Sequence, residues 1–341
     1  PDGADVLASV VRMVVSVNGV GEKLQDLKKK TFAKYDAFTV GEVFNMKREE
    51  LEAFVGENGH FSTMFDFSAN CLSDGPGGWY RNKTIAFDDF RRTVFQSQME
   101  CLDIGFLANI IENHDEPRGS SRFLPEHAQN EMGMKMLGTV SMLLRGLPFL
   151  YQGQEIGMTN CPMNSVEEYN DINTKSEYRL ALEAGLSKED ALAACYRFSR
   201  DNARTPMQWD DSSNAGFTSG TPWLKVNPNY TSVNVALQEK QEDSILNYYR
   251  KLIALRKSEE FRELFTYGDF HPVLEEETEI LAYCRSLGQK KVMVIANFGK
   301  ESAVISDDFF GDCRCLLTND TVRISENRLT LAPAQVVVLT K

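Results

Sequence analysis

The stretch Gly105–Arg118, G-F-L-A-N-I-I-E-N-H-D-E-P-R, decides how the rest of the chain is interpreted. Its first seven residues, Gly105–Ile111, are mostly apolar and partly β-branched, which is typical of a buried strand. Five polar residues, Glu112–Glu116, follow at once, and Pro117 prevents simple continuation of the strand. Side chains that can bind or carry charge are thus presented at the C-terminal end of a buried strand, where α/β folds place their chemistry. A polar turn that only caps the strand is the simpler alternative.

Three further strand-like segments, and helix-like segments between them, predict a parallel sheet. The strands are of the buried type expected in a parallel sheet. Helix-like segments separate each strand from the next, so the order is β-α-β-α-β-α-β. The strands are expected near residues 37–42, 62–67, 105–111 and 147–151, and the helices at Lys47–Val55, Phe87–Cys101 and Glu131–Leu144.

The rest of the chain differs in character from this region. Residues 1–34 read as helical. Residues 159–241 form a long polar excursion with one helical segment, Lys188–Arg197, and an excursion of this length is usually functional. A helix is expected at Ser244–Lys257, and beyond about residue 265 short strands between Gly, Asn and Asp turns predict a small antiparallel domain. Its strands are expected at Ile280–Arg285, Lys291–Phe298, Ser302–Ile305, Cys313–Leu317 and Gln335–Leu339.

Composition and charge limit the class of protein. The chain has 341 residues, enough for one large domain or two medium ones, and its net charge of −12 argues against nucleic acid or an anionic membrane as the main partner. No signal peptide is recognised and no apolar run is long enough to span a bilayer. The 7 cysteines are scattered without a Cys-x-x-Cys pair, which argues against a metal cluster and favours reduced thiols in a cytoplasmic location. Because the first residue is Pro1 rather than Met, we expect the chain to begin inside a longer protein.

Three carboxylates follow predicted strands. Glu42 ends the first strand, Asp115 follows the third and Glu155 follows the fourth. Two of them on strands of one parallel sheet would converge on one pocket. Most enzymes that cleave glycosides use a pair of carboxylates beside the sugar. One carboxylic acid protonates the leaving oxygen, and the other carboxylate acts at the anomeric carbon. A helix cap or a loop anchor is the alternative for each carboxylate taken alone.

Several motifs resemble glycoside hydrolase family 13, the α-amylase family. Thr39-Val-Gly-Glu-Val43 is similar to the third signature region of the family, and Glu112-Asn-His-Asp115 to the fourth. The segment Ser199–Asp210, S-R-D-N-A-R-T-P-M-Q-W-D, resembles the oligo-1,6-glucosidase branch, which also holds dextran glucosidases, α-glucosidases, sucrose isomerases and trehalulose synthases. The same branch is indicated by Leu150–Met158, Asn214–Thr218 and Pro222–Tyr230.

The resemblance implies roles in catalysis or substrate binding for five residues, and a structural role for a sixth. Glu42 matches the general acid/base, which protonates the glycosidic oxygen and later deprotonates the incoming water. Asp115 matches the second acidic residue, which binds hydroxyl groups of the −1 sugar and favours its oxocarbenium-like transition state. His114 matches a histidine that binds the same sugar. Arg200 and Arg204 are both candidates for the sugar- and carboxylate-binding arginine, because a forked guanidinium suits either partner. Glu155 is expected to order the loop after the last strand.

The family's nucleophile has no counterpart in this sequence. It is an aspartate in a Gly-Phe-Arg-x-Asp motif, which does not occur here, and Asp2 and Asp5 lack the arginine and the preceding strand. Four strands are predicted where a closed barrel needs eight. The resemblance therefore implies an α/β fold: the C-terminal half of a (β/α)8 barrel, strands five to eight, over residues 1–262, with 159–241 as the loop after the last strand. A C-terminal antiparallel β domain over 263–341 completes the expected organisation.

The expected function is part of a retaining α-glucosidase that hydrolyses α-1,6 or α-1,4 bonds in short, isomaltose-like oligosaccharides. The chain alone is expected to be inactive, and its partner is expected to be the N-terminal half of the same enzyme or a second copy of itself. No cofactor or metal ion, nucleic acid or membrane is implied. Two alternatives stay open: a non-catalytic half-barrel scaffold or carbohydrate-binding fragment, and part of a sucrose isomerase or transglucosylase. The loop Glu116–Arg122 looks more like that of the hydrolases than that of the isomerases.

Overall fold

The computed structural model describes residues 19–43, 48–73, 75 and 77–341. Asp2, Asp5 and the first part of the predicted helical region, up to residue 18, lie outside the described residues. So does Lys47, the first residue of the predicted short helix.

Four short strands form the parallel arrangement that the sequence predicts. β1 (Val40–Gly41) pairs in parallel with β2 (Thr63–Met64), and β3 (Ala108–Asn109) pairs in parallel with β4 (Leu147–Pro148). A parallel bridge between Phe65 and Ala108 joins the two pairs, so the order across the sheet is β1-β2-β3-β4. The C-terminal ends of β1 and β3, which carry Glu42 and Asp115, therefore lie on the same edge of the sheet.

Each strand is shorter than expected. The amides on either side of Pro148 donate to the carbonyls of Leu107 and Asn109 at 2.8 and 2.9 Å, so the proline lies where the ladder needs no amide hydrogen. Ile110 and Ile111, which the sequence analysis included in the strand, are buried but lie outside the ladder. The length of the apolar run reflects burial of these side chains rather than strand pairing, and the expected strand boundaries are wrong for that reason.

Helices connect and cover the strands. Their bounds are α2 (Val20–Lys30), α3 (Leu51–Phe54), α4 (Phe87–Glu100), α5 (Gly119–Phe123), α6 (Glu131–Met142), α9 (Val235–Gln238), α10 (Ile245–Lys257) and α11 (Arg262–Tyr267). The predicted helices that correspond to α4, α6 and α10 are confirmed to within two residues. The first turns of α6 and α10 are capped by the side chains of Asn130 and Ser244, which accept hydrogen bonds from the amides three residues on.

The polar excursion contains two long helices and the four-residue α9, where one helical segment was predicted from the sequence. α8 (Lys188–Phe198) confirms the predicted segment, and α7 (Ile172–Glu183) precedes it. α7 was missed because its apolar spacing is weak: only Thr174 and Ala181 are buried, whereas Ile172 is 80% exposed. The two helices pack against each other.

The C-terminal strands form two antiparallel sheets. The larger has the order β5-β6-β7-β12-β9 and the smaller the order β10-β11-β8. The strands are β5 (Asp269–Val273), β6 (Ile280–Leu287), β7 (Lys290–Asn297), β8 (Ala303–Ser306), β9 (Arg314–Thr318), β10 (Arg323–Ser325), β11 (Arg328–Leu331) and β12 (Val336–Thr340). β5, β10 and β11 were not predicted from the sequence. β5 contains Pro272, which an edge strand tolerates, and the other two are only 3 and 4 residues long.

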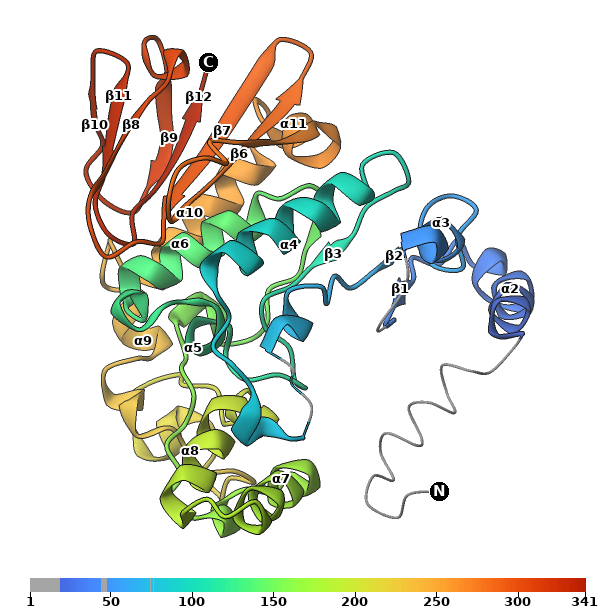
Figure 1. Ribbon diagram of the computed structural model, residues 1–341, viewed down its shortest axis with the longest axis vertical. Helices are drawn as coiled ribbons and strands as arrows, with labels where there is room; N and C mark the ends of the chain where they lie inside the picture. Colours follow the sequence, from blue (N-terminus) through green and yellow to red (C-terminus); the bar gives the residue numbers. More distant parts are fainter. Residues whose placement is uncertain (1–18, 44–47, 74, 76) are drawn as a thin grey trace.

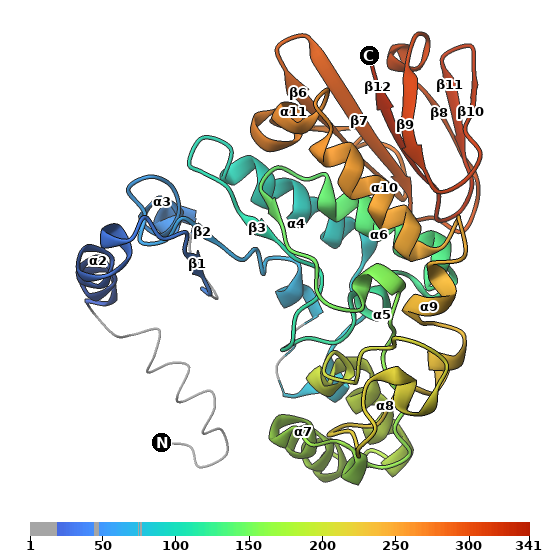
Figure 2. The same ribbon diagram turned by 180° about the vertical axis from the view of Figure 1, so that it is seen from behind.

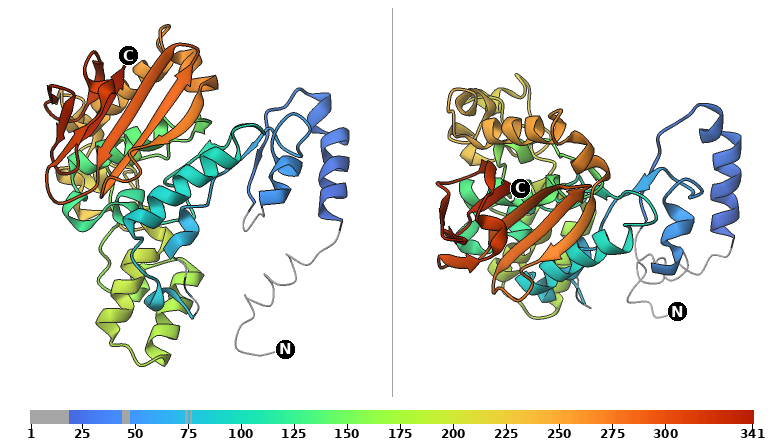
Figure 3. Two further views of the ribbon diagram at one scale, coloured as in Figure 1. Left: turned by 45° about the horizontal axis from the view of Figure 1, so that its top comes forward. Right: turned by 90° about the horizontal axis from the view of Figure 1, so that it is seen from above.

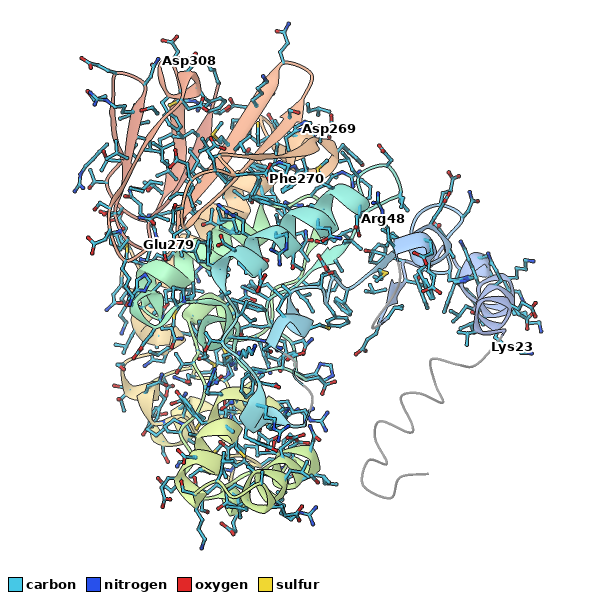
Figure 4. The ribbon with its side chains drawn as sticks, in the orientation of Figure 1. Lys23, Arg48, Asp269, Phe270, Glu279 and Asp308 are labelled. Atoms are coloured by element: carbon cyan, nitrogen blue, oxygen red, sulfur yellow. The ribbon has the colours of Figure 1, made fainter. Side chains whose placement is uncertain are left out.

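The larger sheet packs on helices α4, α6 and α10 (Figure 2). Phe270 of β5 lies on the side of the sheet that faces α4, with its ring 6.0 Å from that of Phe95 (Figure 4). The fully buried Arg285 of β6 donates to the carbonyl of Leu143 at 3.0 Å, just after α6. The hydroxyl of Tyr283 donates to the carbonyl of Val140 in α6 at 2.8 Å. One hydrophobic core therefore extends from the helices into the sheet.

The molecule is elongated, with the C-terminal sheets at one end and α7 and α8 at the other (Figures 1 and 3). The N-terminal elements α2, α3, β1 and β2 project from one side of this body (Figure 1). Among the described residues, no helix combines the length and the apolar character that crossing a membrane requires.

Candidate active site

The loop that follows β3 is closed at its base by a buried ion pair. Arg118 Nη1 lies 3.1 Å from Glu112 Oε2, and both side chains are almost completely buried. The other carboxylate oxygen of Glu112 accepts from the amide of Gly119 at 3.0 Å, and Arg118 also donates to the carbonyl of Gln152 at 2.8 Å. Because the pair joins the two ends of the loop, the residues between them form a tip of defined position.

Asp115 lies at this tip and binds two arginines. Its Oδ1 lies 2.5 Å from Arg204 Nη2 and 3.1 Å from Arg200 Nη1. Its Oδ2 lies 3.3 Å from His114 Nε2. The amide of Asp115 donates to the side chain of Asn113 at 2.7 Å, which bends the backbone. Of the five residues predicted to act in catalysis or substrate binding, the structure therefore brings together all except Glu42.

Both candidate arginines contact Asp115, so this contact does not distinguish between them as the sugar-binding arginine. Arg204 also donates from Nε to the carbonyl of His114 at 2.7 Å and thereby holds the backbone of the loop as well as the carboxylate. Arg200 begins a short 3-10 turn directly after α8. The two arginines reach the loop from the polar excursion, about 90 residues further along the chain.

Two aspartates that were not predicted as site residues contact these arginines. Asp171 Oδ1 lies 2.8 Å from Arg200 Nη2 and accepts from Arg200 Nε at 2.9 Å. Asp201 is completely buried, and its Oδ1 lies 3.9 Å from Arg204 Nη1. Burial raises the pKa of Asp171, but hydrogen bonds from Arg200 and Thr174 outweigh it, so that this pKa lies below its usual range. Asp171 could have been found from the sequence as the N-cap of α7. That inference required α7 to be predicted first.

Glu42 lies directly after β1 and is exposed. The preceding Gly41 is required by close packing, because a Cβ at this position would lie 2.6 Å from the ring of Phe61. A general acid in a glycosidase is usually surrounded by protein. Glu42 does not have such surroundings among the described residues.

Glu155 is half-buried in the 3-10 turn after β4. Its Oε2 is enclosed and has no hydrogen-bond partner among the described residues. Burial raises the pKa of Glu155, and this effect is only partly opposed by nearby backbone amides and by the charge of Arg118. Glu155 lies in the loop after β4 that it is expected to order, and this role stays a prediction.

Comparison with known families shows to which family the chain belongs. A family model described as the catalytic domain of α-amylase matches residues 16–266, more than half of the chain. The chain belongs to the α-amylase family. It therefore has the fold of that family, with antiparallel β-sheets at its C-terminal end.

Relatives in the α-amylase family catalyse different reactions. An oligo-1,6-glucosidase from Parageobacillus thermoglucosidasius is 37% identical over 306 residues, which are 89% of this chain and 54% of the relative. The crystal structure of trehalose-6-phosphate hydrolase from Bacillus licheniformis superimposes with a TM-score of 0.86 and 32% identity, and covers 95% of this chain and 59% of that one. The crystal structure of an isomaltulose synthase from Protaminobacter rubrum also superimposes with a TM-score of 0.86 and 32% identity, and covers 95% of this chain and 59% of that one. The chain thus spans little more than half the length of these members of the α-amylase family.

Proposed function

We propose that this chain is part of a retaining α-glucosidase and carries its acid/base, Glu42, and its transition-state-stabilising carboxylate, Asp115. The observation that supports this most strongly is the binding of Asp115 by Arg200 and Arg204 at the C-terminal end of a parallel strand. That end of the strands is where (β/α) enzymes bind substrate. The carboxylate and its guanidinium partners offer both acceptors and donors, which the hydroxyl groups of a sugar require.

The proposed reaction has two steps. In the first, Glu42 gives its proton to the glycosidic oxygen while a nucleophilic carboxylate attacks the anomeric carbon, so the bond to the leaving sugar breaks and a glycosyl ester forms. In the second, Glu42 removes a proton from water, which attacks the same carbon and releases the nucleophile. Asp115 binds hydroxyl groups of this sugar and stabilises its positive charge in both transition states. His114 and the arginines hold the sugar and Asp115 in place.

We propose that the nucleophile comes from the N-terminal half of the parent protein. The sequence contains no Gly-Phe-Arg-x-Asp motif, and the chain covers 54% of its oligo-1,6-glucosidase relative. The exposed position of Glu42 agrees with this, because a partner that covers β1 would also enclose the acid. In this organisation residues 1–262 form half of a (β/α)8 barrel, and residues 263–341 form the C-terminal β domain.

The proposed substrate is a short α-1,6- or α-1,4-linked glucoside. The oligo-1,6-glucosidase relatives support hydrolysis, and the isomaltulose synthase supports transfer within a sucrose isomerase as the second candidate. Product analysis separates the two candidates: hydrolysis of isomaltose releases glucose, whereas an isomerase converts sucrose into a second disaccharide. A half barrel without catalysis, pairing with itself, would give neither product and would run as a dimer in gel filtration.

Single substitutions in the complete enzyme test the assigned roles. We expect Glu42→Gln and Asp115→Asn each to lower kcat on isomaltose by about 10²–10⁴-fold, the range typical of general acid–base catalysis. Asp190→Asn, an exposed residue in the first turn of α8, is the control and should keep the original rate. Full activity of either the Glu42 or the Asp115 variant would show that its assigned role is wrong.

A further inference from the structure

Arg200 contacts a third residue, Asp171, as well as Asp115. The guanidinium of Arg200 uses one edge, Nε and Nη2, to bind Asp171 Oδ1 at 2.9 and 2.8 Å. This leaves the remaining nitrogen, Nη1, for Asp115 Oδ1 at 3.1 Å. Because the guanidinium is planar, fixing one edge also fixes the direction of the other nitrogen.

Asp171 is at the same time the N-cap of helix α7. Its second oxygen, Oδ2, accepts from the amide and the hydroxyl of Thr174 at 2.9 and 2.8 Å. The two oxygens of one carboxylate therefore serve two purposes: one holds the helix and the other holds Arg200. The start of α7 is thereby joined, through Arg200, to the loop that carries Asp115.

The backbone around Asp171 is itself held by the buried Asp201. Asp201 Oδ2 accepts from the amides of Asn170 and Asp171 at 2.8 and 2.9 Å. Asp201 lies next to Arg200 in the 3-10 turn after α8. Asp171 and Arg200 are therefore linked through the Asp201 side chain as well as directly through their own side chains.

Without such an anchor, Arg200 would lose much of its orientation. Its side chain is 36% exposed, and a free arginine side chain loses rotamer entropy when it is held in one conformation. We propose that Asp171 is a positioning residue for Asp115, which it serves by aiming Arg200 at the carboxylate. The value of this orientation for catalysis rests on the proposed function of Asp115, whereas the mechanical link can be measured without it.

Two substitutions separate this role from helix capping. Asparagine caps helices about as well as aspartate, so Asp171→Asn keeps the cap and removes the charge that holds Arg200. Asp171→Ala removes both. Hydrogen–deuterium exchange of the isolated chain then reports on two segments, residues 112–118 around Asp115 and residues 172–183 of α7.

We expect Asp171→Asn to raise exchange in residues 112–118 at least threefold while α7 exchanges as before, and Asp171→Ala to raise exchange in both. Asp190→Asn, in the first turn of the neighbouring helix, is the matched control and should change neither segment. In an Arg200→Met background, Asp171→Asn should have no further effect on residues 112–118, because the link is already broken. Unchanged exchange around Asp115 in Asp171→Asn, or the same increase in the Arg200→Met background, would overturn the proposal.

Kinetics of the complete enzyme give a second readout. A misdirected Arg200 should lower kcat at least tenfold in Asp171→Asn, with a smaller change in KM, because the orientation of Asp115 matters most in the transition state. Unchanged kcat in Asp171→Asn would overturn the catalytic part of the proposal. If the unsubstituted enzyme shows no glucosidase activity, the proposed function fails, while the exchange experiment still decides whether Asp171 positions the loop.

Discussion

At the scale of single residues, the ion pair of Arg118 and Glu112 joins the two ends of the loop that carries Asp115. Both side chains are buried, and removing one charge of a buried pair leaves the other without compensation. We therefore expect Arg118→Met to lower the free energy of unfolding by about 3–5 kcal/mol, measured by urea denaturation. The control is Arg250→Met, whose ion pair with Glu239 is about half exposed and should contribute less than about 1 kcal/mol. Equal losses of unfolding free energy in the two variants would contradict the structural role of the buried pair.

Glu155 should make stability depend on pH. Because burial raises its pKa, the folded state favours the protonated carboxyl. The stability that this provides is complete below about pH 4, the ordinary range of a glutamate, and is lost as the pH rises through the folded-state pKa. Glutamine cannot ionise, so Glu155→Gln should gain melting temperature relative to the original protein between pH 5 and pH 8. A constant difference in melting temperature across this range would show that the pKa of Glu155 is not raised in the folded state.

The residues around Asp115 show how far sequence reasoning reaches at this scale. His114, Asp115, Arg200 and Arg204 were selected from motifs, and the structure brings them into contact, although their roles stay predictions. Asp171 could not be selected, because its partner lies 29 residues away and the contact exists only when α7 forms. Motifs identify the residues that touch a substrate more readily than the residues that hold them.

At the scale of elements, Gly138 sets how closely α6 and α10 pack. A Cβ at Gly138 would lie 2.6 Å from Cζ of Tyr249, which is buried in α10. The hydroxyl of Tyr249 accepts a hydrogen bond from the side-chain amide of Gln154. Alanine favours a helix by about 1 kcal/mol over glycine, but the overlap with a buried ring outweighs this gain. We expect Gly138→Ala to lower the free energy of unfolding by about 1–3 kcal/mol.

The comparison for Gly138→Ala is Gly220→Ala. A Cβ at Gly220 would meet only the hydroxyl of Thr218, at 3.6 Å, so its effect on urea denaturation should be small. Equal stability of Gly138→Ala and the original protein would mean that α6 and α10 can move apart without a loss of stability.

The elements that sequence reasoning predicted correctly are those with strong apolar spacing. α4, α6, α8 and α10 have buried residues at helical intervals, and their predicted boundaries agree with the structure to within two residues. The parallel strands were located but given too many residues, since apolar side chains next to a strand are buried without joining its ladder. α7 and β10 were missed because few of their side chains are buried.

At the scale of the whole molecule, the helices and the C-terminal sheet share one core. The largest hydrophobic cluster joins Leu137 of α6 and Leu252 of α10 to Leu281 of β6 and Val338 of β12. We therefore expect calorimetry to show one main unfolding transition for these elements, with equal calorimetric and van't Hoff enthalpies. Two well-separated transitions, one of which leaves the β-sheet folded, would show that the proposed domains at 1–262 and 263–341 are independent.

The N-terminal elements share little of that core. Leu51, Val55 and Met64 form a small separate cluster with Cys101 and Leu107. The projecting segment therefore depends on few buried contacts in this chain, which agrees with a proposed partner that covers β1. Nothing in the sequence pattern alone could have indicated this, because the same apolar residues would serve equally well in a closed barrel.

The rate of p-nitrophenol release from p-nitrophenyl α-glucoside tests the proposed division of the catalytic residues most directly. It is measured on the pure 341-residue chain, first alone and then after addition or co-expression of the N-terminal half of its parent protein. We expect no release above the uncatalysed rate from the chain alone, because the covalent step lacks its nucleophile, and turnover once the second half is present. Turnover by the pure chain, lost in Asp115→Asn, would contradict the account.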